Sequence, residues 1–419
     1  MIKKIFLHIG IHKTATSSIQ EALGKGKDIL ASYGYLYPIF NRKKDLIYNH
    51  SEVFYSLFCQ NPHQYYMNIV KGFNSKDLVD ELHKNYKDQL KSQLQVFKGD
   101  FLMISGEDIS MFAIQELEKL KDFLIEITNT DVQIEVVMLC RNPLSWSRAH
   151  IQEVMKGGKN IKEAIEENNI LPQPFYRTKI ENLSKVFAYN SLHICRFEDI
   201  ISHKYGPIGG ILSIIGADAE IASQLQIEIH NQSPSYESMM LLNAINIEIP
   251  RVINHRLNPI YQDYRPKYIH QLPGQKFSLD AKQKEHIWKR DQDDIQWLCK
   301  TFNLLEYKLT ADNLLNNSEK WNANVMQYLG HTLPEQPMQV KVIIFKELFQ
   351  EFNKYRPSFS LKKKLMMFSY FIQFSSYFQL NTRIQQFQYV KKQIGLFCSL
   401  KLSFILILRA FVLKIKSSN

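Results

Sequence analysis

The chain has 419 residues with an ordinary apolar content of 45%, enough for one large α/β domain with an extension, or for two domains. Its formal net charge of +11 favours an anionic ligand, an acidic polymer or a membrane surface as a partner. The five cysteines lack metal-ligand spacing, and their odd number argues against a complete disulfide framework. Free thiols in a reducing compartment are the interpretation that remains.

The first predicted element is a short apolar strand at residues 5–9, followed by a tight polar turn and a helix. Gly10 ends the strand, and from Thr16 onward apolar residues recur at helical spacing, with Thr or Ser where a hydroxyl cap is expected. The first amides of a helix lack partners inside it, and the helix dipole adds partial positive charge there. Lys13 adds a full positive charge, and hydroxyl donors come from Thr14, Thr16, Ser17 and Ser18. This combination predicts a site for a dianionic group such as a phosphate.

The loop differs from the P-loop of nucleoside triphosphatases. A P-loop places its first glycine six residues ahead of a Gly-Lys pair. Here Gly10 lies only three positions before Lys13, and His12 replaces the second glycine. The shorter loop fits a single 5′-phosphate better than a triphosphate. A P-loop kinase of a small molecule stays an alternative, and it would need a magnesium-binding carboxylate.

The segment His8-Ile-Gly-Ile-His-Lys-Thr-Ala-Thr-Ser-Ser-Ile-Gln20 resembles the 5′-phosphosulfate loop of bacterial sulfotransferases that use 3′-phosphoadenylyl sulfate (PAPS), which are similar to carbohydrate sulfotransferases. That loop commonly reads His-x-Gly-x-x-Lys-Thr-Gly-Thr-Thr-Ser-Ile-Gln, so Ala15 and Ser17 depart from it. Ala15 at the glycine position predicts a helical backbone there, not a left-handed one. The resemblance implies PAPS as the sulfuryl donor, without a metal. It also implies donor contacts from His12, Lys13, Thr14, Ala15, Thr16, Ser17 and Ser18, with Lys13 neutralising the leaving 5′-phosphate.

Residues 28–38 indicate a helix end and a short strand, and the polar segment 41–51 follows with His50. In the similar enzymes a histidine of this region faces the acceptor. The resemblance therefore makes His50 a base or an acceptor ligand. A surface or helix-capping histidine is an equal alternative.

A second buried strand at residues 101–105 ends just before Glu107. In an open parallel sheet, ligands lie beyond the carboxyl ends of the strands, so Glu107 is expected at the same crevice as the loop. A carboxylate can take the acceptor hydroxyl proton when desolvation raises its pKa. The alternative is that Glu107 or Asp108 caps the helix predicted at 111–126.

The strand predicted at 132–140 leads directly into Arg141-Asn-Pro-Leu-Ser-Trp-Ser-Arg148. This segment resembles the family's 3′-phosphate site, in which an arginine follows a strand and precedes a helix. The guanidinium of Arg141 suits a phosphate because it donates two parallel hydrogen bonds. The family usually has a serine eight residues later, where this chain has Ala149. Candidates to replace it are Ser145, Ser147 and Arg148.

A fourth strand is predicted at 191–196, and together these elements predict an α/β fold: a P-loop-like, three-layer parallel sheet flanked by helices, with a mostly helical C-terminal extension. The predicted organisation is a sulfotransferase-like domain at 1–305, a linker at 306–340 and a basic, aromatic-rich helical extension at 341–419.

Within the extension, the apolar stretch from Leu402 to Ile415 is shorter than the about 20 residues that span a bilayer. It is expected to lie in the headgroup layer of a membrane, or to pack on the main domain or on a partner chain. No nucleic-acid motif is present, so nucleic acid is not an expected partner.

The resemblance thus implies a cytoplasmic enzyme of polysaccharide biosynthesis, with a possible site at the inner face of the membrane. It would move the sulfuryl group of PAPS in line to a hydroxyl of a glycan or glycoconjugate. Because Ala149 stands where the family has serine, an inactive glycan-binding or membrane-associated scaffold on the same fold stays open.

Overall fold

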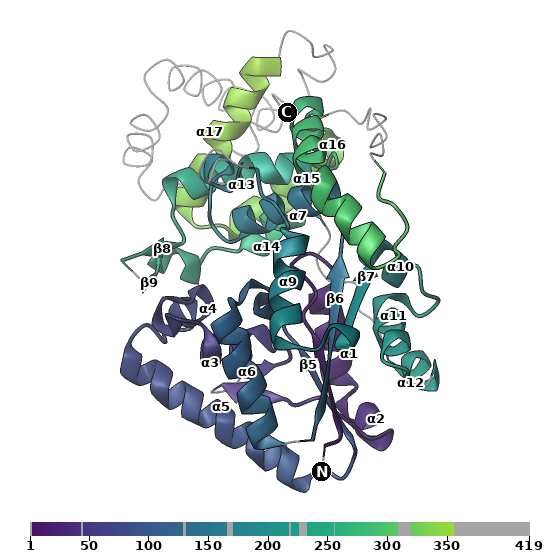
Figure 1. The fold of residues 1–419 in the computed structure, drawn as a ribbon. Coiled ribbons are helices and arrows are strands. Elements are labelled where there is room, and N and C mark those ends of the chain that lie inside the picture. Colours follow the sequence, from purple (N-terminus) through teal and green to yellow (C-terminus); the bar gives the residue numbers. More distant parts are fainter. Residues whose placement is uncertain are drawn as a thin grey trace, which may run out of the picture.

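A five-stranded parallel sheet forms the centre of the molecule (Figure 1). The computed structural model describes residues 2–42, 45–128, 131–165, 171–217, 219–225, 233–254, 256–308 and 320–355. In spatial order the strands are β2 (Tyr35–Leu36), β5 (Phe101–Ser105), β1 (Lys4–His8), β6 (Gln133–Cys140) and β7 (Leu192–Arg196). In the central strand Ile5 lies opposite Leu102 and Ile134. The four strands predicted from the sequence are confirmed, as is the short strand expected within 28–38.

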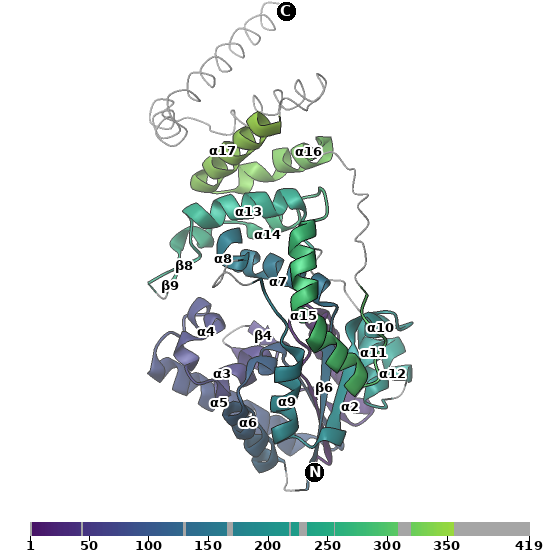
Figure 2. The ribbon, with the colours of Figure 1, turned by 45° about the horizontal axis from the view of Figure 1, so that its top comes forward.

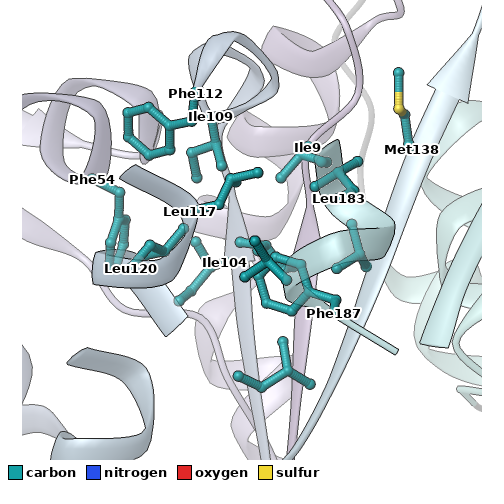
Figure 3. Close-up of a cluster of buried hydrophobic side chains, with 14 of the residues drawn as sticks. Ile9, Phe54, Ile104, Ile109, Phe112, Leu117, Leu120, Met138, Leu183 and Phe187 are labelled. Atoms are coloured by element: carbon teal, nitrogen blue, oxygen red, sulfur yellow. The ribbon is translucent and has the colours of Figure 1, made fainter. Parts of the chain in front are cut away.

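The sheet is covered by helices on both faces, which makes three layers. Successive side chains of β1 point to opposite faces, so Ile5 and Leu7 join one core and Phe6 joins the other. The first core receives side chains from α5 (Lys76–Val96), α6 (Ile114–Ile127) and α9 (Tyr176–Val186), and Figure 3 shows part of it. The second receives them from α1 (Thr16–Lys25), α2 (Lys27–Ser32), α11 (Gly206–Ile214) and α12 (Ala219–Gln224). The predicted fold class is therefore confirmed.

A further helical layer lies beyond the carboxyl ends of the strands (Figures 1 and 2). Its apolar core includes the buried residues Ile151, Leu242, Leu329 and Ile344. They come from α7 (Pro143–Lys156), α13 (Tyr236–Glu248), α16 (Ala323–Thr332) and α17 (Met338–Tyr355). Helix α7 starts directly after β6, so it links the sheet to this layer.

The described chain contains further α-helices and two short strand pairs. The helices are α3 (Ser56–Phe58), α4 (Tyr66–Val70), α8 (Ile161–Ile165), α10 (Phe197–Ile201), α14 (Pro266–His270) and α15 (Ala281–Thr301). Two antiparallel pairs join β3 (Phe40–Arg42) to β4 (Asp45–Ile47) and β8 (Val252–Ile253) to β9 (Arg256–Leu257).

After residue 305 the described chain consists mainly of the helices α16 and α17. Helix α16 lies inside the range 306–340 that we expected to be a linker, and Trp321 just before it is fully buried. The domain boundaries stay a prediction, and the stretch Leu402–Ile415 lies outside the described residues. Among the helices that are described, none has the length and apolar character needed to cross a membrane.

Candidate active site

The loop between β1 and α1 has a left-handed backbone at two residues. Lys13 has a φ of 70°, and Ala15 has a φ of 60° with a ψ of 18°. The expectation of a helical Ala15 is therefore wrong. Ala15 occupies the N-cap position of α1 without a side-chain cap hydrogen bond, so the expected hydroxyl cap is wrong as well. Left-handed backbone costs about 1–3 kcal/mol at a residue with a side chain, and such strain concentrates at functional sites.

Three side chains hold this loop by its carbonyl oxygens. The Thr14 hydroxyl donates to Ile11 O (2.6 Å), Trp146 Nε1 donates to His12 O (2.9 Å) and Arg141 Nη1 donates to Lys13 O (2.6 Å). Arg141 and Trp146 follow β6, so the loop after β1 is shaped by the neighbouring strand's continuation. Since Ile19 N donates to Ala15 O (3.1 Å), the helix amides ahead of Ile19 have no partner within the helix.

A cavity of about 580 Å³ opens in front of this loop. Its walls are the loop, one face of α7 and the segment after β7. Eight of the residues predicted from the sequence line it: His12, Lys13, Ala15, Thr16, Ser17, Ser18, Glu107 and Arg141. The structure thus brings together residues that are more than 120 positions apart in the chain.

Arg141 is held between the loop and the segment after β7. Its Nε donates to Ser145 Oγ (2.9 Å), and its guanidinium lies 4.9 Å from the ring centre of Phe197. Burial lowers the pKa of Arg141, and the nearby charge of Arg148 acts in the same direction. Ser145 therefore positions Arg141 rather than lining the cavity itself.

The structure also shows what occupies the place of the family's serine. Ala149 lines the cavity, so this helical position faces the site even without a hydroxyl. Ser147 does not replace it, because its side chain is buried and its hydroxyl donates to Pro172 O (2.8 Å). Thr14 likewise contributes no exposed hydroxyl, because its side chain is fully buried and its hydroxyl donates to Ile11 O.

Sequence reasoning missed three cavity residues on α7. Gln152, Glu153 and Lys156 line the cavity together with Ala149, at the i, i+3, i+4 and i+7 positions of one helical face. That spacing, counted from Ala149, was the signal that could have found them. Glu153 Oε2 accepts a hydrogen bond from Lys13 Nζ (2.7 Å) and lies 3.8 Å from Lys156 Nζ. Burial acts to raise the pKa of Glu153, but the two lysines outweigh it and lower that pKa to about 2.

Glu107 lies where β5 ends, inside a polar cluster. Gln20 Nε2 donates to its Oε2 (2.6 Å) and Asn49 Nδ2 donates to its Oε1 (3.3 Å). Burial raises the pKa of Glu107, the charge of Asp108 adds to this, and His12 opposes it. Neither Glu107 nor Asp108 caps α6, which begins only at Ile114; both lie in the first turn of a 3₁₀ helix at Glu107–Met111.

Asp108 completes the cluster. Its Oδ1 lies 3.0 Å from His12 Nε2, and its Oδ2 accepts a hydrogen bond from the Tyr65 hydroxyl (2.5 Å). Burial acts to lower the pKa of His12, but the hydrogen bond and charge of Asp108 raise it above its ordinary value. His12 is thereby held at the cavity beside the loop.

His50 lies in the protein interior, away from this cavity. It is fully buried, its Nδ1 accepts a hydrogen bond from Ser105 N (3.0 Å), and its Nε2 is 2.8 Å from Pro38 O. Its ring stacks on Tyr37, and burial lowers its pKa to about 4. Both ring nitrogens form hydrogen bonds with backbone groups. The expectation that His50 faces the acceptor is therefore wrong.

A second cavity of about 790 Å³ adjoins the first. His12, Ser17, Glu107 and Glu153 line both. A reaction between a ligand in the first cavity and one in the second would therefore take place beside Glu107. Within the described part of the chain, no cluster of three or more His, Cys, Asp or Glu side chains could hold a metal ion.

Comparison with known proteins gives a structural likeness. No protein-family model and no curated protein matches the chain. The fold is similar to that of a solved structure described as a sulfotransferase from Alicyclobacillus acidocaldarius, with 10% sequence identity and a TM-score of 0.40. The likeness covers 73% of this chain and 97% of that chain.

Proposed function

We propose that this protein is a PAPS-dependent sulfotransferase that acts on a hydroxyl of a glycan or glycoconjugate. The observation that carries the proposal is the convergence of the strained loop, Lys13 and Arg141 on one cavity. The resemblance of residues 8–20 to the phosphosulfate loop supports the choice of donor. The adjoining second cavity supplies the space for an acceptor.

Donor binding would use two groups of residues. The unpaired amides of α1, the hydroxyls of Ser17 and Ser18 and the ammonium of Lys13 suit the 5′-phosphate end. Arg141 suits the 3′-phosphate, because Ser145 and the Lys13 carbonyl already fix its guanidinium in place. For this pairing, Lys13 Nζ exchanges its present partner, Glu153, for the donor.

Bound PAPS would supply a sulfuryl group already activated by its link to a phosphate. Glu107, at the junction of the cavities, takes the proton of the acceptor hydroxyl as that oxygen bonds to sulfur. Burial makes Glu107 a stronger base than an ordinary carboxylate by raising its pKa. Lys13 neutralises the charge left on the 5′-phosphate when the sulfur–oxygen bond breaks. Alignment and charge stabilisation thus provide the catalysis.

Calorimetry with a matched pair of nucleotides tests donor recognition. Adenosine 3′,5′-bisphosphate and adenosine 5′-monophosphate differ only by the 3′-phosphate, so the first should bind at least tenfold more tightly. In Arg141→Lys that advantage should shrink, because a lysine cannot donate two parallel bonds. Tighter binding of ATP with magnesium than of the bisphosphate would favour the kinase alternative and overturn the proposal.

Transfer itself is tested with PAPS carrying labelled sulfate and a panel of glycans. Lys13→Ala should lower the rate by about 10²–10³-fold, as expected for a lost stabilising donor. Glu107→Gln should lower it by about 10²–10⁴-fold while nucleotide affinity is kept. Nucleotide binding without transfer to any acceptor would instead support the inactive scaffold.

A further inference from the structure

The second cavity carries mainly acidic groups although the whole chain is basic; His12, which is paired with Asp108, and His150 also line it. Its walls carry five carboxylates, from Glu52, Glu107, Asp108, Glu116 and Glu153, and the described residues that line it include neither lysine nor arginine. The chain as a whole has a net charge of +11. The cavity that would receive the acceptor is therefore unlike the rest of the molecule.

Three cations near this cavity are already paired with its own carboxylates, whereas a fourth, Arg251, lies 5.5 Å from the ring centre of Tyr66 and donates to Lys156 O. Arg42 Nη2 lies 2.6 Å from Glu52 Oε2, and His12 and Lys13 contact Asp108 and Glu153. An incoming carboxylate or sulfate would have to break one of these pairs, or draw Arg251 away from the ring of Tyr66, to find a cation. It would otherwise lie beside carboxylates, where like charges repel.

The two other carboxylates are held by neutral donors. Glu107 accepts from the Gln20 and Asn49 side chains. Glu116 Oε1 accepts from Gln60 N (2.9 Å), and its Oε2 accepts from Ala113 N (2.8 Å). A carboxylate oxygen has further lone pairs, so both groups can also accept hydrogen bonds from ligand hydroxyls.

Aromatic rings form another part of the same wall. Tyr55, Tyr65 and Tyr66 line the cavity, with the rings of Tyr55 and Tyr65 4.8 Å apart between centres. Asn61 and Gln64 add amide groups. Aromatic side chains together with oxygen acceptors match a sugar, which has C–H groups on its faces and hydroxyls at its rim.

From this arrangement we infer that the acceptor is an uncharged, hydroxyl-rich sugar unit, and not a uronic-acid or sulfated unit. The inference rests on the proposed function and narrows its acceptor. The net charge of +11, taken alone, would instead favour an acidic polymer as the acceptor.

Matched pairs of oligosaccharides test this inference directly. Glucan, galactan and mannan oligosaccharides would be compared with the same compounds oxidised at C6 to uronates, with transfer of labelled sulfate from PAPS as the readout. We expect label on neutral members and at least tenfold less on their oxidised partners. Equal or greater labelling of the oxidised members overturns the inference, and so does a protein that binds adenosine 3′,5′-bisphosphate but labels no sugar. If the nucleotide does not bind at all, the failure belongs to the proposed function.

A charge-neutralising variant tests whether the carboxylates of the cavity wall cause the preference for neutral over oxidised sugars. Glu116→Gln removes one wall charge, and its amide oxygen can still accept from Ala113 N in the capping box at α6, while Gln60 N loses its acceptor. Glu118→Gln makes the same change at an exposed position of the same helix that does not line the cavity. The preference for neutral sugars should fall at least threefold in Glu116→Gln and stay unchanged in Glu118→Gln. An equal effect in both variants, or in neither, contradicts the inference.

Discussion

Glu153 is paired with the lysine that we propose binds the donor's phosphate, so neutralising Glu153 should tighten nucleotide binding. Its Oε2 lies 2.7 Å from Lys13 Nζ and 3.8 Å from Lys156 Nζ. A bound phosphate group must take Lys13 from this carboxylate and then remain close to its negative charge. Glu153→Gln removes the charge and keeps the shape of the side chain.

The size of the effect follows from the exposure of the group. The Glu153 side chain is 51% exposed, so the dielectric constant of water is the appropriate choice. Two unit charges about 4 Å apart then interact by about 1 kcal/mol. Releasing Lys13 from a solvent-exposed ion pair adds up to about 1 kcal/mol. The sum of about 1–2 kcal/mol corresponds to an affinity gain of about 5- to 30-fold.

Calorimetric titration with adenosine 3′,5′-bisphosphate measures this gain. Because the two lysines lower the pKa of Glu153 to about 2, the carboxylate is ionised throughout pH 6–8 and the gain should be constant there. It should shrink as salt is added, since exposed charges are screened. Glu126→Gln is the matched control, because Glu126 is exposed and lies beside Ile2, away from the first cavity. Weaker binding by Glu153→Gln would refute the reasoning and show that Glu153 orients Lys13 for the donor.

Three further predictions concern the loop, the interior and the cavity wall. Ala15→Gly should stabilise the protein by about 1 kcal/mol in urea unfolding, because glycine adopts the left-handed backbone without strain. The pKa of about 4 at buried His50 lies below that of an unfolded histidine, so its contribution to stability is present above about pH 6.5 and is lost as the pH falls toward 4. That loss, at most about 3 kcal/mol, should be reduced in His50→Gln. Ala149→Ser should bind adenosine 3′,5′-bisphosphate about 2- to 10-fold more tightly, since it adds a hydroxyl to the cavity wall.

Each of these has a matched comparison. Ala281→Gly, at an exposed first position of α15, should destabilise by up to about 1 kcal/mol, and a loss of stability in Ala15→Gly as well would contradict the strain argument. An unchanged pH dependence in His50→Gln would show that another group causes the acid loss. If Ala149→Ser binds adenosine 5′-monophosphate more tightly by the same factor, the new hydroxyl does not contact the 3′-phosphate.

Local sequence patterns were sufficient to predict the sheet and the position of the site. The apolar runs at 5–9, 101–105, 132–140 and 191–196 are strands. Continuous apolar runs of this length suit a buried strand and are shorter than an ordinary helix. Polar residues that directly follow such runs must lie at one edge of a parallel sheet. That rule predicted that Glu107 lies at the same crevice as the Lys13 loop, whereas Arg141 was expected there from the family resemblance, and all three line one cavity.

Contacts between distant segments decided the remaining features, and local patterns do not encode them. Ala15 is left-handed in a loop whose carbonyl oxygens bond to Trp146 and Arg141, and these contacts outweigh the preference of an alanine for helical backbone. His50 is buried because residues 38 and 105 meet around its ring. The pairing of Lys13 with Glu153 joins residues 140 positions apart, and the acidic wall of the second cavity is likewise assembled from several segments. Sequence periodicity indicates which face of a helix or strand is apolar. Which side chain a residue meets across a cavity depends instead on how the helices and strands pack.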